Sequence, residues 1–135
     1  KTLQDNIFDL TQLILTKKID QARDLVKDLT LQGEDEIKLI AIMLGQFRLY
    51  TQVKILQESG QTESQMVSSL GHYLGRNPNP YQIKFALRDS RRLSLDFLQN
   101  SIRYLIQADY QIKTGVYEKG YLFEKALLQI ASQSN

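Results

Sequence analysis

The residues of this sequence that are able to do metal, nucleophilic or acid–base chemistry are few. His72 is the single histidine among 135 residues and cysteine is absent. A zinc site or a histidine-based catalytic triad therefore lacks its usual side chains. No G-x-x-x-x-G-K-[ST] segment and no dinucleotide fingerprint is present to hold a phosphate. We expect a domain without catalytic residues, cofactor or metal ion.

Three aspartates recur at every fourth position and so share one face of a helix: Asp20, Asp24 and Asp28. Carboxylates grouped in this way suggest a cation site. Arg23 and Lys27 alternate with them, however, and mixed charge is typical of a helix face in contact with water. We interpret the three aspartates as a solvated face.

Asp109 is a carboxylate at a position where the helical period calls for an apolar residue. The stripe on which it falls consists of Leu95, Leu98, Ile102, Leu105 and Ile112. A carboxylate on a core stripe costs free energy unless it is paired, and Lys113 follows at the four-residue spacing that suits an ion pair. Two interpretations remain open: a half-buried pair or helix-end bond within the fold, and a rim of contact with another chain.

A group of basic residues lies in the second half of the sequence: Arg76, Lys84, Arg88, Arg91 and Arg92. Their spacing after Pro80, together with the short helix before it, gives this segment the outline of a helix-turn-helix, as in DNA-binding regulators. The connection over residues 71–79 is longer than the turn of that motif, and Asp89 dilutes the charge. We favour a basic rim on an interaction domain, able to touch a DNA backbone without reading bases: Lys84, Arg88, Arg91 and Arg92.

The elements that must position these residues are helices. Apolar spacings and stop signals predict about seven of them, near residues 7–14, 19–29, 34–58, 62–71 or 62–75, 80–87, 95–115 and 121–131. Asp5 or Asn6 is the expected cap of the first, Thr62 with Gln65 forms a capping box, and Ser94 caps the sixth. No segment alternates convincingly, so we expect one all-α bundle over residues 1–135.

Composition is consistent with this expectation. The net charge is +2 and 42% of residues are hydrophobic, as in an ordinary globular domain. The longest apolar run, Ile37 to Leu44, is far shorter than the roughly 20 residues of a membrane span. The sequence begins without the pattern of a signal peptide. We expect a cytoplasmic chain with no membrane partner.

Three segments taken in order resemble one known protein family. They read LIAIMLGQFRLYTQVK, NPYQIKFALRDSRRLS and ADYQIKTG, and a Tyr-Leu-Phe-Glu-Lys-Ala-Leu-Leu helix follows. This ordered set closely resembles the C-terminal domain of the delta subunit of the bacterial DNA polymerase III clamp loader. The opening NIFDLTQLI extends the resemblance to nearly the whole chain. The family pattern falls on Gln46, Phe47, Arg48, Lys54, Pro80, Asp109, Lys113 and Gly115.

The resemblance implies a collar domain, through which five related subunits hold together as a ring that loads a sliding clamp on primed DNA. Its partners would be clamp-loader subunits of the delta-prime and gamma/tau types in a bacterial cytoplasm, and DNA contact would occur within the assembled ring. The sliding clamp would be gripped by N-terminal modules that this sequence does not contain. Catalysis would belong to the DNA polymerase III holoenzyme and not to this domain.

The resemblance also implies residues that form or support subunit contacts. In it, Asp109 and Lys113 make a satisfied pair near a contact, and Gly115 lets the chain turn sharply afterwards. The full set is Gln46, Arg48, Lys54, Asp109, Lys113 and Gly115. Two alternatives remain beside the collar: a helix-turn-helix-like DNA-binding regulator, and a helical adaptor with another partner.

Overall fold

The computed structural model describes the backbone of residues 1–74 and 80–134, and the side chains of these residues except 72–74, 80 and 81. The described residues form seven α-helices and no strand, which confirms the all-α expectation. His72 and Arg76 lie outside the described side chains, as does Gly75, one expected end of the fourth helix. The helices are α1 (Leu3–Leu15), α2 (Ile19–Leu31), α3 (Glu36–Glu58), α4 (Glu63–Leu74), α5 (Pro80–Ser90), α6 (Leu95–Lys113) and α7 (Lys119–Gln133).

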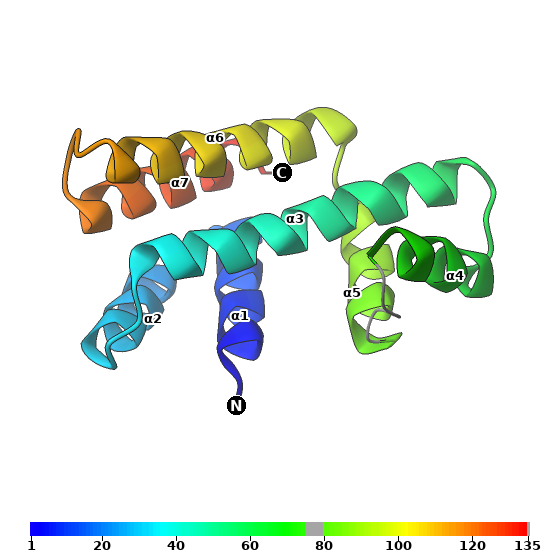
Figure 1. Cartoon of the computed structure of the whole chain (residues 1–135), viewed down its shortest axis with the longest axis horizontal. Coiled ribbons are helices and arrows are strands. Elements are labelled where there is room, and N and C mark those ends of the chain that lie inside the picture. Colours follow the sequence, from blue (N-terminus) through cyan, green and yellow to red (C-terminus); the bar gives the residue numbers. More distant parts are fainter. Residues whose placement is uncertain (75–79, 135) are drawn as a thin grey trace.

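Helix α3 is the centre of the fold. In Figure 1 the antiparallel α6–α7 hairpin lies along one side of α3, while α1, α2 and α5 lie on the other side and α4 lies beside its C-terminal half. Packing on both sides explains why α3 is apolar around much of its circumference. Its buried side chains are Leu39, Ile40, Met43, Leu44, Phe47, Tyr50 and Val53.

Among the described residues, α3 is also the one helix long and apolar enough to cross a membrane. Helices α1, α4, α5, α6 and α7 all pack against it. A core helix surrounded by others has the same composition, so its hydropathy follows from its place in the bundle.

The expected caps at α4 and α6 are confirmed. The Thr62 hydroxyl accepts from the Gln65 amide at 3.2 Å, and the Gln65 side chain accepts from the Thr62 amide at 2.8 Å. The Ser94 hydroxyl accepts from the Phe97 amide at 3.0 Å. The expectation for α1 was wrong: Thr2 is its cap, and Asp5 is the third residue of a capping box that begins there.

The turn between α6 and α7 depends on a glycine. Gly115 has φ +71°, in the left-handed region that residues with a Cβ rarely adopt, and the Val116 amide after it donates to the Gln111 carbonyl at 3.0 Å. The chain reverses there and enters α7 at Lys119. Gly115 therefore sets the sharp return of the hairpin.

Candidate functional site

Two of the residues expected at subunit contacts connect helices within the fold. Gln46 on α3 accepts a hydrogen bond from the buried Thr11 hydroxyl at 2.8 Å and donates to the Gln4 carbonyl at 3.4 Å. The Lys54 ammonium donates to the Ser90 carbonyl, the last residue of α5, at 2.9 Å. Gln46 thus joins α3 to α1, and Lys54 joins α3 to the C-terminal end of α5, where a cation is favourable.

Arg48 is the exposed one of the three expected contact residues on α3. It lies two residues from Gln46 on α3 and its side chain faces solvent. Its role in a subunit contact therefore stays a prediction, as do the contact roles of Gln46 and Lys54.

Asp109 and Lys113 form the ion pair expected from their spacing. The Lys113 ammonium lies 2.9 Å from the Asp109 carboxylate, and the side chains are 57% and 26% exposed respectively. Asp109 is therefore half-buried and paired within its own helix. The carboxylate on the core stripe is satisfied inside the fold, and its contact with another chain stays a prediction.

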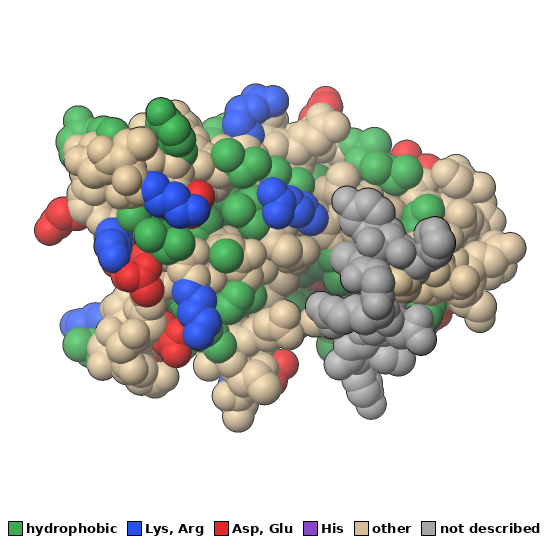
Figure 2. Space-filling model, in the orientation of Figure 1, with side chains coloured by type: hydrophobic (Ala, Val, Ile, Leu, Met, Phe, Trp, Pro, Cys, Tyr) green, Lys and Arg blue, Asp and Glu red, His purple; other side chains and the backbone are tan. Residues whose placement is uncertain are grey.

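Exposed apolar side chains gather on the α6–α7 hairpin. Of the eight large hydrophobic residues that are exposed among the described residues, six belong to it: Ile106, Tyr110, Val116, Tyr117, Tyr121 and Leu128. We call this set the hairpin surface. Figure 2 shows hydrophobic side chains at the end of the molecule where Figure 1 places the α6–α7 turn. Exposed apolar side chains that are grouped on one hairpin make this surface a candidate for contact with another protein.

The edge of the hairpin surface is polar and held in place. The Lys119 ammonium lies 2.8 Å from the Asp35 carboxylate, which also caps α3 through the Ile37 amide at 2.7 Å. The hydrogen bond from Lys119, followed by that from the Ile37 amide, lowers the pKa of Asp35 from its ordinary value. The same pair raises the pKa of Lys119. The start of α7 is thereby tied to the start of α3.

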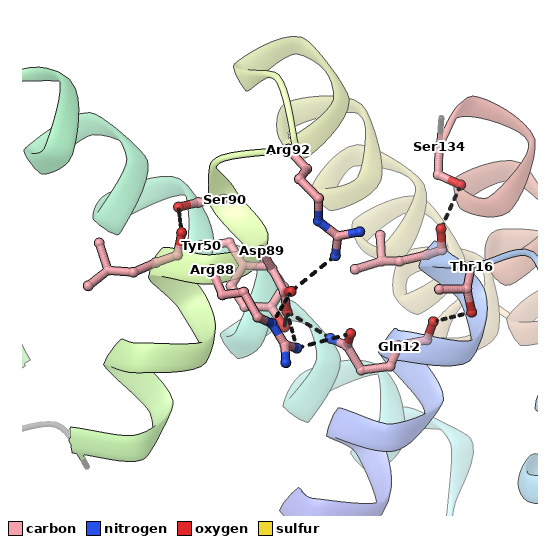
Figure 3. A network of polar contacts seen from close by, with 10 residues as sticks. Gln12, Thr16, Tyr50, Arg88, Asp89, Ser90, Arg92 and Ser134 are labelled. Carbon is pink, nitrogen blue, oxygen red and sulfur yellow. Dashed lines mark hydrogen bonds and ion pairs between the residues drawn. The ribbon is translucent and has the colours of Figure 1, made fainter.

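A buried carboxylate, that of Asp89, lies among the residues of the basic rim expected on α5. Asp89 is 0% exposed, and its oxygens accept from the Gln12 amide at 2.8 Å, the Tyr50 hydroxyl at 3.4 Å and the Arg88 Nε at 3.0 Å. Arg92 adds a bond at 3.2 Å. Figure 3 shows these side chains converging from α1, α3, α5 and the turn after α5.

We call these five residues the Asp89 network. Within it, the Arg88 and Arg92 side chains remain 53% and 61% exposed, so each guanidinium meets Asp89 on one side and solvent on the other. Arg88 also donates to the Gln12 side chain at 3.3 Å and lies 4.9 Å from the Phe85 ring centre. Burial, and then the charge of Asp89, raises the pKa of Tyr50 above its ordinary value.

A signal for Asp89 was present in the sequence. Ile83 and Ala86 are both 0% exposed and are followed by Asp89 at the same spacing of three, so the carboxylate continues a buried stripe. This is the pattern that drew attention to Asp109. Lys84 and Arg91 are exposed as expected of a rim.

The three aspartates of α2 are exposed, in line with a solvated face. Among the described residues, no group of three His, Cys, Asp or Glu side chains is arranged to hold a metal ion.

Residues 4–130 match the family described as the DNA polymerase III delta subunit, C-terminal domain. The chain belongs to this family. The resemblance drawn from the sequence is thereby confirmed, and the hairpin surface and the Asp89 network are features of a delta C-terminal domain.

Two relatives of this delta C-terminal domain support the assignment. DNA polymerase III subunit delta of Bacillus subtilis is 33% identical over 134 residues, which are 99% of this chain and 37% of the relative. The solved structure of the Bacillus subtilis DNA clamp loader delta protein (YqeN) matches with a TM-score of 0.85 and 32% identity, over 98% of this chain and 38% of that protein. The chain thus spans somewhat more than a third of the length of each relative.

Proposed function

We propose that this chain is the assembly domain of a clamp-loader delta subunit, and that it holds a ring of subunits together so that a sliding clamp is loaded on primed DNA during replication. The family match and the solved clamp-loader relative support the proposal. The proposed partners are delta-prime and gamma/tau-type subunits in a bacterial cytoplasm. In this proposal the domain performs no catalysis itself, contacts DNA only within the ring, and leaves the clamp to other parts of a longer protein.

The observation that carries the proposal is the hairpin surface. Tyr110, Tyr117 and Tyr121 are 66%, 64% and 54% exposed, although each ring would be stabilised by burial. Tyrosine is enriched where protein interfaces are fully buried, because it combines a large apolar ring with a hydroxyl that tolerates water. A group of exposed tyrosines on one hairpin is therefore typical of a subunit contact.

The geometry of the hairpin surface suits a rigid contact. The rings of Tyr117 and Tyr121 pack edge to face with centroids 5.7 Å apart, which limits their freedom before any partner arrives. The Asp109–Lys113 and Asp35–Lys119 pairs lie beside the turn and supply a charged edge. An apolar centre with a polar edge is the usual anatomy of a protein interface.

A shallow hollow adjoins this surface. It has a volume of about 360 Å³ and lies between α2 and α7, beside Tyr121 and Leu128, with Arg23 and Glu124 paired across it. We expect side chains of a partner that covers the tyrosines to enter this hollow at the edge of the contact.

Size-exclusion chromatography with light scattering tests the proposal. The chain is mixed with delta-prime and gamma/tau-type subunits of the same organism, and we expect co-elution as one complex. Tyr117→Ser with Tyr121→Ser should abolish co-elution while leaving the helical circular dichroism unchanged, because both side chains are more than half exposed. Leu31→Ser is the matched control: Leu31 is 75% exposed on α2 and is not one of the residues of the hairpin surface, so its loss should leave the complex intact.

Co-elution that survives the double tyrosine substitution would refute the hairpin surface as the contact. Loss of the complex in Leu31→Ser alone would assign the contact to α2 instead.

A further inference from the structure

An open groove is lined by residues of α1, α3 and α5 and has a volume of about 360 Å³. Its apolar lining consists of the half-buried side chains of Phe8, Leu49 and Phe85, together with the buried Tyr50. The Phe8 and Phe85 rings lie with their centroids 4.9 Å apart. In Figure 1 α1 and α5 lie on the other side of α3 from α6 and α7. The groove shares no residue with the hairpin surface.

The remaining lining of the groove is polar and almost uncharged. Three glutamine side chains contribute to it: Gln4, Gln46 and Gln82. Of the described lining residues only Asp5 is charged, and its carboxylate accepts from the Thr2 amide at 3.2 Å in the capping box of α1. Because these residues include no cation, the groove suits neither a phosphate backbone nor an acidic segment. It suits an apolar side chain on a stretch of peptide whose backbone groups meet the glutamine amides, which both donate and accept.

The first residues of α1 form one wall of this groove. Thr2, Gln4 and Asp5 belong to its lining, and the backbone at Thr2 is extended, with φ −76° and ψ 162°. The capping box and the ion pair between Lys1 and Asp9 hold these residues against α1. Figure 1 shows the N-terminus on the same side of α3 as α1 and α5. A segment joined before Lys1 therefore starts beside the groove.

The relatives of this domain are longer proteins. The matching family is described as a C-terminal domain, and this chain spans 37% and 38% of the two relatives. In a delta protein of that length, the additional chain lies mainly before this domain. A segment tethered close to its site has an effective concentration of about 1 mM. A free partner at about 1 µM needs about a thousandfold higher affinity to occupy the same site equally.

We propose that the groove holds the segment that directly precedes residue 1 in a longer delta protein. An aromatic or aliphatic side chain of that segment lies among Phe8, Leu49 and Phe85, and its backbone continues the extended conformation of Thr2. The docked segment fixes the direction in which the preceding part of the protein leaves this domain. The proposal rests on membership of the delta family and is independent of the ring contact.

Hydroxyl-radical footprinting with mass spectrometry tests the proposal by comparing this chain with the longer delta protein of the same organism. Oxidation of Phe8, Leu49 and Phe85 should be about fivefold slower in the longer protein, as an effective concentration of about 1 mM gives for a dissociation constant of about 0.2 mM. Oxidation of Tyr110 and Tyr121 on the hairpin surface should be equal in both proteins.

Equal oxidation of the groove residues in the two proteins would overturn the proposal. Protection that arises only after delta-prime and gamma/tau-type subunits are added would also overturn it and would assign the groove to a neighbouring subunit. The footprint of the longer protein alone does not depend on ring assembly, so a failure of the assembly proposal leaves this test unchanged.

Limited proteolysis of the longer protein tests the groove by substitution. Leu49→Gln should speed cleavage before residue 1 about fourfold, because cleavage follows the undocked fraction of the segment. Ile55→Gln is the matched control: Ile55 is 49% exposed on the same helix and does not line the groove, so its loss should leave the cleavage rate unchanged. Circular dichroism of both variants checks that the fold is retained. An unchanged rate in folded Leu49→Gln, or equal acceleration in both variants, would contradict docking in this groove.

Discussion

The Asp89 network makes a sharp prediction about non-additive stability. Arg88→Ala and Arg92→Ala each remove one cation that is more than half exposed and leave the other in place, so each should cost about 1 kcal/mol of unfolding free energy. The double variant leaves a carboxylate that is 0% exposed with only the Gln12 and Tyr50 donors. Removing the cationic partners of a buried charge costs about 3–5 kcal/mol.

The difference is measurable by a double-mutant cycle. Urea unfolding followed by circular dichroism should give a coupling energy of about 1–3 kcal/mol between the two arginines, a large share of the roughly 5–15 kcal/mol of a typical domain. The m-value should be unchanged, because the surface exposed on unfolding is the same. Additive losses that total about 2 kcal/mol or less would refute the view that Asp89 depends on both cations.

A third substitution tests whether the unpaired charge of Asp89 or lost packing causes the loss of stability in the double variant. Adding Asp89→Asn to the double variant removes the unpaired charge while keeping an acceptor for Gln12 and Tyr50. The triple variant should therefore be more stable than the double variant, although it has lost one more native residue. A triple variant less stable than the double would show that packing, and not charge, dominates this site.

Three further predictions follow from single positions. Asp109→Leu should keep the helical circular dichroism but alter co-elution with the clamp-loader subunits; unaltered assembly with only a shifted melting temperature would make the pair structural. Because the folded state holds the Tyr50 proton more tightly than the unfolded chain, stability should fall as pH rises above about 10, and Tyr50→Phe should weaken this fall in an alkaline unfolding series. Ser94→Ala should cost about 1 kcal/mol in urea unfolding through the lost cap of α6, whereas no loss would show that the cap is dispensable.

The features predicted correctly from the sequence are local ones. The Thr62–Gln65 box and the Ser94 cap join residues three positions apart, so both partners can be recognised from their spacing in the sequence. The Asp109–Lys113 pair was expected for the same reason and spans four positions. At α1 the box was missed because Asp5 or Asn6 was expected to be the cap, whereas Asp5 is the third residue after the cap Thr2.

The Asp89 network was not predicted because its partners are distant in the sequence. Gln12 and Tyr50 lie 77 and 39 positions away, and only the packing of α1 and α5 against α3 brings them to the carboxylate. The same holds for Lys54, whose acceptor on Ser90 is 36 positions away. The helical period identifies a polar residue on a buried stripe, but the partner that satisfies it depends on how the helices pack.

Arg88 and Arg92, which were expected to form part of a basic rim, illustrate that spacing alone does not identify the partner of a side chain. Arg88 and Arg92 were grouped with Lys84 and Arg91 by spacing alone, whereas the structure ties the first two to Asp89 and leaves the other two exposed. The contact roles of all four toward DNA stay predictions.

The central claim, that this delta C-terminal domain assembles a ring, is tested most directly by native mass spectrometry. The chain is mixed at micromolar concentration with delta-prime and gamma/tau-type subunits of the same organism. We predict a complex that contains one copy of this 15.6 kDa chain and that loses it when Tyr117 and Tyr121 are replaced by serine. Detection of every component only at its own mass, with the chain folded, would contradict an assembly role for the domain.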